Sequence, residues 1–198
     1  MKKLLFVGLI AILAIGCGSS RKVSRIDSTT TTDLSGQWND TDARLVAQEM
    51  ISDCLSRPWI DEFLTKAATK PVVTVGAIRN MSSEHINTEI FTADIERELI
   101  NSGRVKFVAS KPERQEIRDE RQDQKEYASP ETIKRMRDET GADFLLTGAV
   151  KTIVDQIENK RVVFYQTDLQ LINIETNEKA WIGTKEIKKE ISKGSTKW

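Results

Sequence analysis

Near its C-terminus the chain reads DFLLTGAVKTIVDQIENKRVVFYQTDLQLINIETNEKAWIGTKEIKKEI, residues 143–191. Three runs in this stretch are rich in β-branched and aromatic residues: 143–153, 161–174 and 178–191. Short polar turns at 158–160 and 176–177 separate the runs, which is typical of hairpins. The stretch therefore predicts three consecutive antiparallel strands, a β-meander.

Strand and helix patterns alternate before the meander. Residues 72–78 (VVTVGAI) form a nearly continuous apolar run, typical of a strand in the centre of a sheet. Apolar residues recur every four positions from Val46 to Cys54, which predicts an amphipathic helix between about Trp38 and Pro58. Four more helices are expected over about 59–69, 87–102, 110–127 and 129–141, with a short strand at 105–108. We expect an α/β fold: a single mixed β-sheet with helices packed on it.

The N-terminus, MKKLLFVGLIAILAIGC, has a cationic start, an apolar run and a small residue before Cys17. This is the pattern of a secretory signal peptide, and about a dozen apolar residues are too few to span a bilayer. The last four residues, AIGC (14–17), resemble the lipobox of bacterial lipoproteins, although Ala14 stands where that motif prefers Leu. We expect residues 1–16 to be a signal peptide and Cys17 to be lipidated. The alternative is a plain signal peptide with an incidental Cys.

Residues 17–37 are rich in Ser, Thr, Gly and charged side chains, so they predict a lipidated flexible linker. Gly18 follows the Cys where an Asp would favour retention at the inner membrane in enterobacterial-type sorting. The resemblance therefore implies the outer membrane, on its periplasmic side. Residues 38–198 are the expected globular domain.

The charge balance argues against nucleic-acid binding. Removal of residues 1–16 takes away two lysines and no acidic residue, which leaves 28 basic and 30 acidic side chains. A domain with this even balance has no positive field that would attract a phosphate backbone.

Few residues offer catalytic chemistry. Cys54 and the single His, His85, are the only candidate nucleophile and base, but Cys54 lies on an apolar helix stripe and His85 in a polar loop. Abundant carboxylates follow the spacing of solvated helix faces. The sequence therefore predicts no enzyme, no metal site and no cofactor. A small envelope hydrolase is the disfavoured alternative.

The run 161–174 suggests a partner-binding site. Val162, Phe164 and Gln166 alternate onto one face of the predicted strand, and mixed polarity there suggests that no helix covers it. We take these three residues, with the neighbouring basic Arg161, as the candidate site. The alternative is that the N-terminal helix over 38–55 covers them.

Several motifs carry a family resemblance: SGQWNDTD (35–42), PW (58–59), the strand 72–78, GADFLLTG (141–148), YQ (165–166) and NIETNEKAW (173–181). They resemble the LpoB family of lipoproteins, which activate penicillin-binding proteins and have a globular domain similar to the N-terminal domain of TolB. The resemblance covers about residues 35–191. It implies a monomeric outer-membrane lipoprotein that docks on a class A penicillin-binding protein.

One departure concerns the linker, which here has about 20 residues and no Pro, whereas well-studied members have a long Pro-rich linker. This puts the reach across the periplasm in question. The alternative function is a structural or secretion-related, CsgG-like envelope lipoprotein that oligomerises through its sheet edge.

Overall fold

The computed structural model describes residues 22–129, 131 and 138–192. The predicted signal peptide and Cys17 lie outside the described residues, and so does most of the helix predicted over 129–141. The chain divides into two units at Thr30. The described part of the first unit contains a turn in which the Thr29 hydroxyl donates to the Asp27 carboxylate over 2.6 Å. The second unit contains all the described helices and strands.

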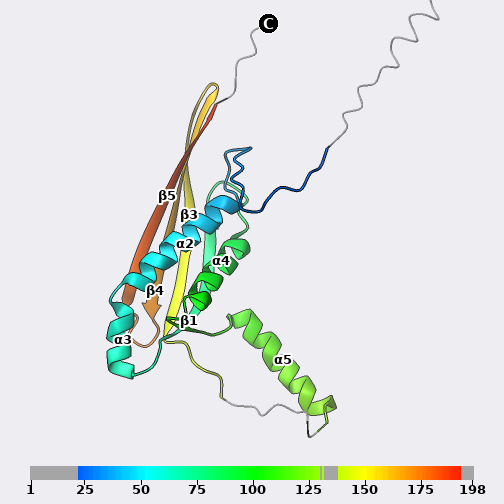
Figure 1. Ribbon diagram of the computed structural model, residues 1–198, viewed down its shortest axis with the longest axis vertical. Helices are drawn as coiled ribbons and strands as arrows, with labels where there is room; N and C mark the ends of the chain where they lie inside the picture. The colour runs from blue at the N-terminus through cyan, green and yellow to red at the C-terminus, as the bar shows by residue number, and fades with distance from the viewer. Residues whose placement is uncertain (1–21, 130, 132–137, 193–198) are drawn as a thin grey trace, which may run out of the picture. The chain divides into compact units, whose positions relative to one another are not determined.

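The described strands form one mixed sheet, as predicted (Figure 1). They are β1 (Val72–Met81), β2 (Lys106–Phe107), β3 (Phe144–Ile157), β4 (Lys160–Asn173) and β5 (Lys179–Ser192). Their order is β2-β1-β3-β4-β5. β1 runs parallel to β2 and β3, whereas β3, β4 and β5 are antiparallel. The predicted meander is confirmed. β1 lies beside it as an interior strand between β2 and β3, and its first four residues are buried on both faces, as its apolar run indicated.

The β3–β4 hairpin is longer than the sequence suggested. β3 continues to Ile157 and pairs residue by residue with β4, down to Ile157 opposite Lys160. Glu158 in the turn has a φ of 45°, and Asn177 in the next turn has a φ of 60°. Both are left-handed, a conformation that a tight turn requires and that Asn tolerates well. β1 stops opposite Lys151, so the outer part of the hairpin has no strand beyond β3 among the described residues.

Four described helices accompany the sheet: α2 (Asp40–Ser56), α3 (Trp59–Ala67), α4 (Thr88–Asn101) and α5 (Lys111–Tyr127). α2 begins with a capping box, in which the Asn39 side chain accepts from the Asp42 amide and Asp42 accepts from the Asn39 amide. A capping box of Ser110 and Glu113 is present at the start of α5, where the Glu113 carboxylate accepts from the Ser110 amide over 2.7 Å. No helix in the described part of the chain is long and apolar enough to cross a membrane.

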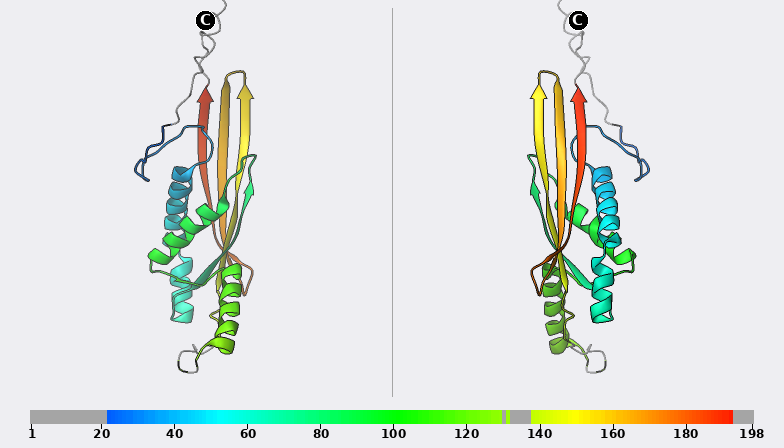
Figure 2. Two further views of the ribbon diagram at one scale, coloured as in Figure 1. Left: turned by 90° about the vertical axis from the view of Figure 1, so that its right-hand side faces the viewer. Right: turned by 90° about the vertical axis from the view of Figure 1, so that its left-hand side faces the viewer.

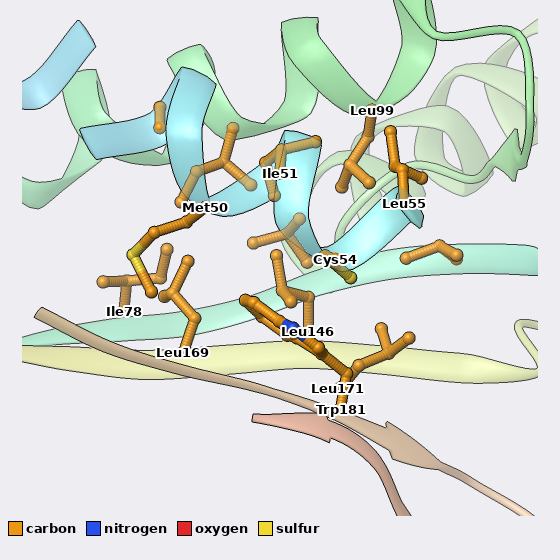
Figure 3. Packing of buried hydrophobic residues seen from close by; sticks show 14 of the residues in the cluster. Met50, Ile51, Cys54, Leu55, Ile78, Leu99, Leu146, Leu169, Leu171 and Trp181 are labelled. Carbon is orange, nitrogen blue, oxygen red and sulfur yellow. The ribbon is translucent and has the colours of Figure 1, made fainter. Parts of the chain in front are cut away.

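The hydrophobic core lies between one face of the sheet and α2, α3 and α4. Figure 3 shows Ile51 and Cys54 of α2 above Leu146 of β3 and Leu171 of β4, and all four are at most 1% exposed. The four-residue spacing in the sequence therefore marked the buried stripe of α2 correctly. The outer ends of β3, β4 and β5 extend past α2 and α4 (Figure 2).

α5 is a solvated helix, as its composition predicted. It buries none of its residues, and Ile117 and Tyr127 are both exposed. Arg118 forms a two-pronged ion pair with Glu139, with distances of 2.8 and 2.7 Å.

Candidate functional site

One side of β3, β4 and β5 points away from the helices, and most of its side chains are exposed or half-buried. We define the meander face as the side chains of β3, β4 and β5 that point away from the helices: Lys151, Ile153, Asp155, Ile157, Val162, Phe164, Gln166, Asp168, Thr184, Glu186, Lys188 and Glu190. Cross-strand pairing arranges these residues in rows, and the central row is Ile153, Phe164 and Lys188. The next row is Lys151, Gln166 and Glu186. Residues directly opposite on neighbouring strands share a face, so these side chains are neighbours.

The outer part of the meander face combines apolar side chains with the charged side chains of Asp155, Lys188 and Glu190. Ile153 and Ile157 of β3 are 68% and 72% exposed, and Val162 and Phe164 of the middle strand, β4, are half-buried. Such exposure follows from the length of the hairpin, because β3 and β4 continue beyond the last residue of β1. An exposed aliphatic and aromatic group on a sheet face is typical of a protein contact site.

The inner part of the meander face is a polar network around Asp168. Its carboxylate accepts hydrogen bonds from Lys151 Nζ (2.8 Å), Gln166 Nε2 (2.9 Å) and Thr184 Oγ1 (2.8 Å). Partial burial acts to raise the pKa of Asp168, but these three donors outweigh it and lower the pKa below its usual value. Lys151 and Gln166 are thus held in place beside the apolar group.

Arg161 does not lie on the meander face. Its side chain lies on the other face of β4, the one that carries Val163 and Tyr165. Its guanidinium lies 4.0 Å from the Glu84 carboxylate. The sequence placed Arg161 beside Val162 and Phe164. Strand alternation separates them, because successive side chains point to opposite faces.

Glu84 is the centre of a network on the covered face of β4. Its side chain is 6% exposed and accepts from the Tyr165 hydroxyl (2.8 Å) and from the backbone amide of Trp38 (3.1 Å). The Tyr165 hydroxyl also lies 3.3 Å from the Gly36 carbonyl. This network fastens the segment just before α2 to β4.

The alternative that the N-terminal helix covers Val162 and Phe164 is wrong. α2 packs with Leu169 and Leu171, which belong to the other face of β4. Val162, Phe164 and Gln166 keep part of their surface in solvent. The structure therefore brings these three predicted residues together on one accessible face.

The remaining sequence candidates do not form a site. Cys54 is buried in the core, where burial raises the pKa of its thiol to about 12, and His85 is exposed. Within residues 22–129, 131 and 138–192, no group of three or more His, Cys, Asp or Glu side chains could hold a metal ion.

Sequence reasoning missed two parts of the meander face. Ile157 was missed because the predicted strand ended at Ile153, although the hairpin turn begins only after Ile157. The Asp168 network was missed because its members come from three strands, and only the register brings Lys151 and Thr184 to Asp168. The position of the predicted turn at 158–160 was the signal that pointed to the first of these, because residues 154–157 lie directly before it.

Comparison with known proteins identifies the family. A family model described as peptidoglycan-synthase activator LpoB matches residues 42–187. No match was found among curated proteins. Among solved structures, the chain is similar to the LpoB C-terminal domain from Escherichia coli, with 18% identity over 74% of this chain and 98% of that chain, at a TM-score of 0.44.

Two further structures show weaker similarity. Lipoprotein GNA1162 from Neisseria meningitidis matches with 13% identity over 64% of this chain and 88% of that chain, at a TM-score of 0.39. The PelC dodecamer from Paraburkholderia phytofirmans matches with 16% identity over 61% of this chain and 73% of that chain, at a TM-score of 0.30. Because the LpoB model covers residues 42–187, well over half of the sequence, the chain belongs to the LpoB family of peptidoglycan-synthase activators.

Proposed function

We propose that this chain is an outer-membrane lipoprotein, anchored through Cys17 on the periplasmic side, that binds and activates a class A penicillin-binding protein through the meander face. Family membership supports the activator role. The observation that carries the docking site is the exposed Ile153 beside the half-buried Phe164, the apolar pair of the central row, on a face that no described helix covers.

The composition of the meander face suits a protein contact. Ile153, Ile157 and Phe164 supply apolar surface, and the charged neighbours beside them are Lys151, Asp155, Lys188 and Glu190. Protein interfaces commonly combine a central apolar anchor with a polar edge that excludes water. A rigid three-stranded sheet also loses little conformational entropy on binding, which favours affinity.

Activation in this proposal comes from binding alone. A bound activator accelerates a synthase only if it binds the active conformation more tightly than the inactive one. Val162, Phe164 and Gln166 are the proposed contact residues on β4. Arg161 contributes only indirectly, through its pairing with Glu84 behind the sheet.

The end of the expected linker, residues 17–37, contacts the folded unit. Lys189 Nζ lies 2.6 Å from Asp33 and 2.6 Å from Asp42, and its side chain is only 11% exposed. Asp33 and Gly36 belong to the second unit, and the roughly 15 residues between Cys17 and Asp33 would reach at most ~50 Å if fully extended. The proposal therefore requires the synthase contact to lie within this distance of the outer membrane.

The test compares two identical substitutions at exposed isoleucines. Ile153→Lys places a charge in the apolar pair, whereas Ile90→Lys, on α4 at 56% exposure, leaves the meander face intact. We expect Ile153→Lys to weaken binding to the purified class A synthases of the same cell by tenfold or more, on the order of 1.4 kcal/mol. Equal binding by the two variants would contradict the docking site.

Sizing of the detergent-solubilised protein separates the proposal from the oligomerising alternative. The activator is expected to be a monomer, and Ile153→Lys should not change its size. A ring or higher oligomer that loses activity when dissociated would instead favour the alternative function, a CsgG-like lipoprotein that oligomerises.

A further inference from the structure

A second accessible surface lies away from the outer end of the meander. α4, the first turn of α5 and the outer edge of β1 enclose a groove of about 780 Å³. Ala93 of α4 and Leu145 at the start of β3 contribute apolar surface, and Val75 and Gly76 of β1 line its floor. Leu145 and Ile153 stand near opposite ends of β3, so the groove is distinct from the apolar pair of the meander face.

The floor of this groove is an unfilled sheet edge. β2 pairs with β1 only at Val72 and Val73, and its last contact is the Val108 amide donating to the Val73 carbonyl over 3.1 Å. β1 then continues to Met81 with a strand neighbour on the β3 side alone, within the described residues. A strand edge of this kind offers backbone amides and carbonyls to an incoming extended segment.

The groove also contains a carboxylate that pairs with no basic side chain among the described residues. Glu96 of α4 is half-buried and has no hydrogen bond or ion pair within the described part of the chain. Burial, and then the charge of Glu113 nearby, raise the pKa of Glu96. Arg114 also lines the groove but forms no ion pair with Glu96 among the described residues, and its guanidinium donates to the Ala109 carbonyl over 2.8 Å. Lys111 at the rim is exposed and forms no ion pair with it among the described residues.

We propose that this groove binds an extended segment of a partner protein, one that alternates apolar side chains and places a Lys or Arg beside Glu96. The backbone of the segment pairs with the edge of β1 beyond β2. Its apolar side chains pack on Ala93 and Leu145, and its cation relieves the repulsion between Glu96 and Glu113. This inference does not rest on the synthase proposal, because it uses other residues and another end of the sheet.

Two synthetic peptides test the proposal on the full mature chain carrying Cys17→Ser. One is the acetylated heptapeptide Thr-Val-Thr-Lys-Thr-Val-Thr, and the other has Glu in place of Lys. Binding is followed by NMR through the amide shifts of Val75 and Ala93. We expect the Lys peptide to bind with a dissociation constant of about 1 mM or tighter, and the Glu peptide to bind about tenfold more weakly or worse.

Three variants separate groove binding from a general charge effect. Glu96→Gln should remove the preference for the Lys peptide, whereas Glu98→Gln, the same change two residues further along α4, should leave it intact. Ala93→Trp fills the groove and should abolish binding of both peptides. The proposal is overturned if neither peptide shifts Val75 and Ala93 at about 5 mM, or if Glu96→Gln keeps the full preference.

Discussion

Replacement of Tyr165 by Phe tests whether the Glu84 network fastens the segment before α2 to the sheet. The ring of Tyr165 is fully buried and packs against Trp38 with ring centroids 5.7 Å apart, so Phe keeps the packing. The change removes only the hydroxyl, which donates to the Glu84 carboxylate over 2.8 Å. The substitution therefore removes the charge-assisted hydrogen bond to Glu84 together with the longer contact to the Gly36 carbonyl at 3.3 Å.

The expected loss can be worked from the partners of Glu84. A hydrogen bond to a charged group contributes about 1.5–3 kcal/mol. Glu84 keeps the Trp38 amide and the nearby Arg161 after the change, so we expect the lower half of that range, about 2 kcal/mol. For a folded unit that spans Thr31–Trp198, this corresponds to a fall in Tm of roughly 4–8 °C.

Urea denaturation of the two single tyrosine variants measures the effect. Tyr127→Phe is the matched control, because Tyr127 is 74% exposed on α5 and should change stability by less than about 0.5 kcal/mol. A double-mutant cycle with Glu84→Gln should give a coupling energy of about 1 kcal/mol or more. Additive effects, or a loss for Tyr165→Phe no larger than that for Tyr127→Phe, would refute the reasoning.

Three further outcomes follow from the packing and the charges. A Cβ at Gly148 would lie 2.2 Å from the Asp168 carbonyl oxygen, so Gly148→Ala should lower the free energy of unfolding by about 2–4 kcal/mol, measured by urea denaturation. Gly141→Ala is the control and should not lower it, because a Cβ at Gly141 would meet no atom within 4 Å. Asp168 has a lowered pKa in the folded state, so its contribution is present above about pH 4 and is lost as the pH falls through the folded pKa. The stability gap between the wild type and Asp168→Asn should therefore narrow as the pH falls below about 4, and a constant gap would argue against the network. Because burial raises the pKa of Cys54 to about 12, its thiol in the Cys17→Ser variant should react with a disulfide reagent at neutral pH only after unfolding, and immediate reaction would show that the thiol is accessible.

Local patterns predicted the elements of this fold well. The four-residue spacing from Val46 to Cys54 defined the buried stripe of α2, and the β-prone runs separated by polar turns after Asp143 defined the meander. Both signals are strong because one face of each element is buried and the other is solvated. The polar turns marked the hairpins because left-handed turn residues cannot continue a strand.

The sites were harder to predict, since they depend on register and on contacts between distant segments. Arg161 was grouped with Val162 because they are adjacent in sequence, yet the alternation of the strand puts them on opposite faces. The exposure of Ile157 depends on where β1 ends relative to β3, which no local pattern shows. The Glu96 groove combines three segments, and nothing in the sequence brings α4, α5 and β1 together.

The most direct test of the proposed function is the rate of glycan polymerisation by the purified class A synthase, measured with and without the full mature protein. We predict that the wild type and Ile90→Lys accelerate polymerisation to the same extent, whereas Ile153→Lys accelerates it at least tenfold less at subsaturating concentration. An unchanged rate with the wild type, or equal acceleration by Ile153→Lys, would contradict activation through the meander face.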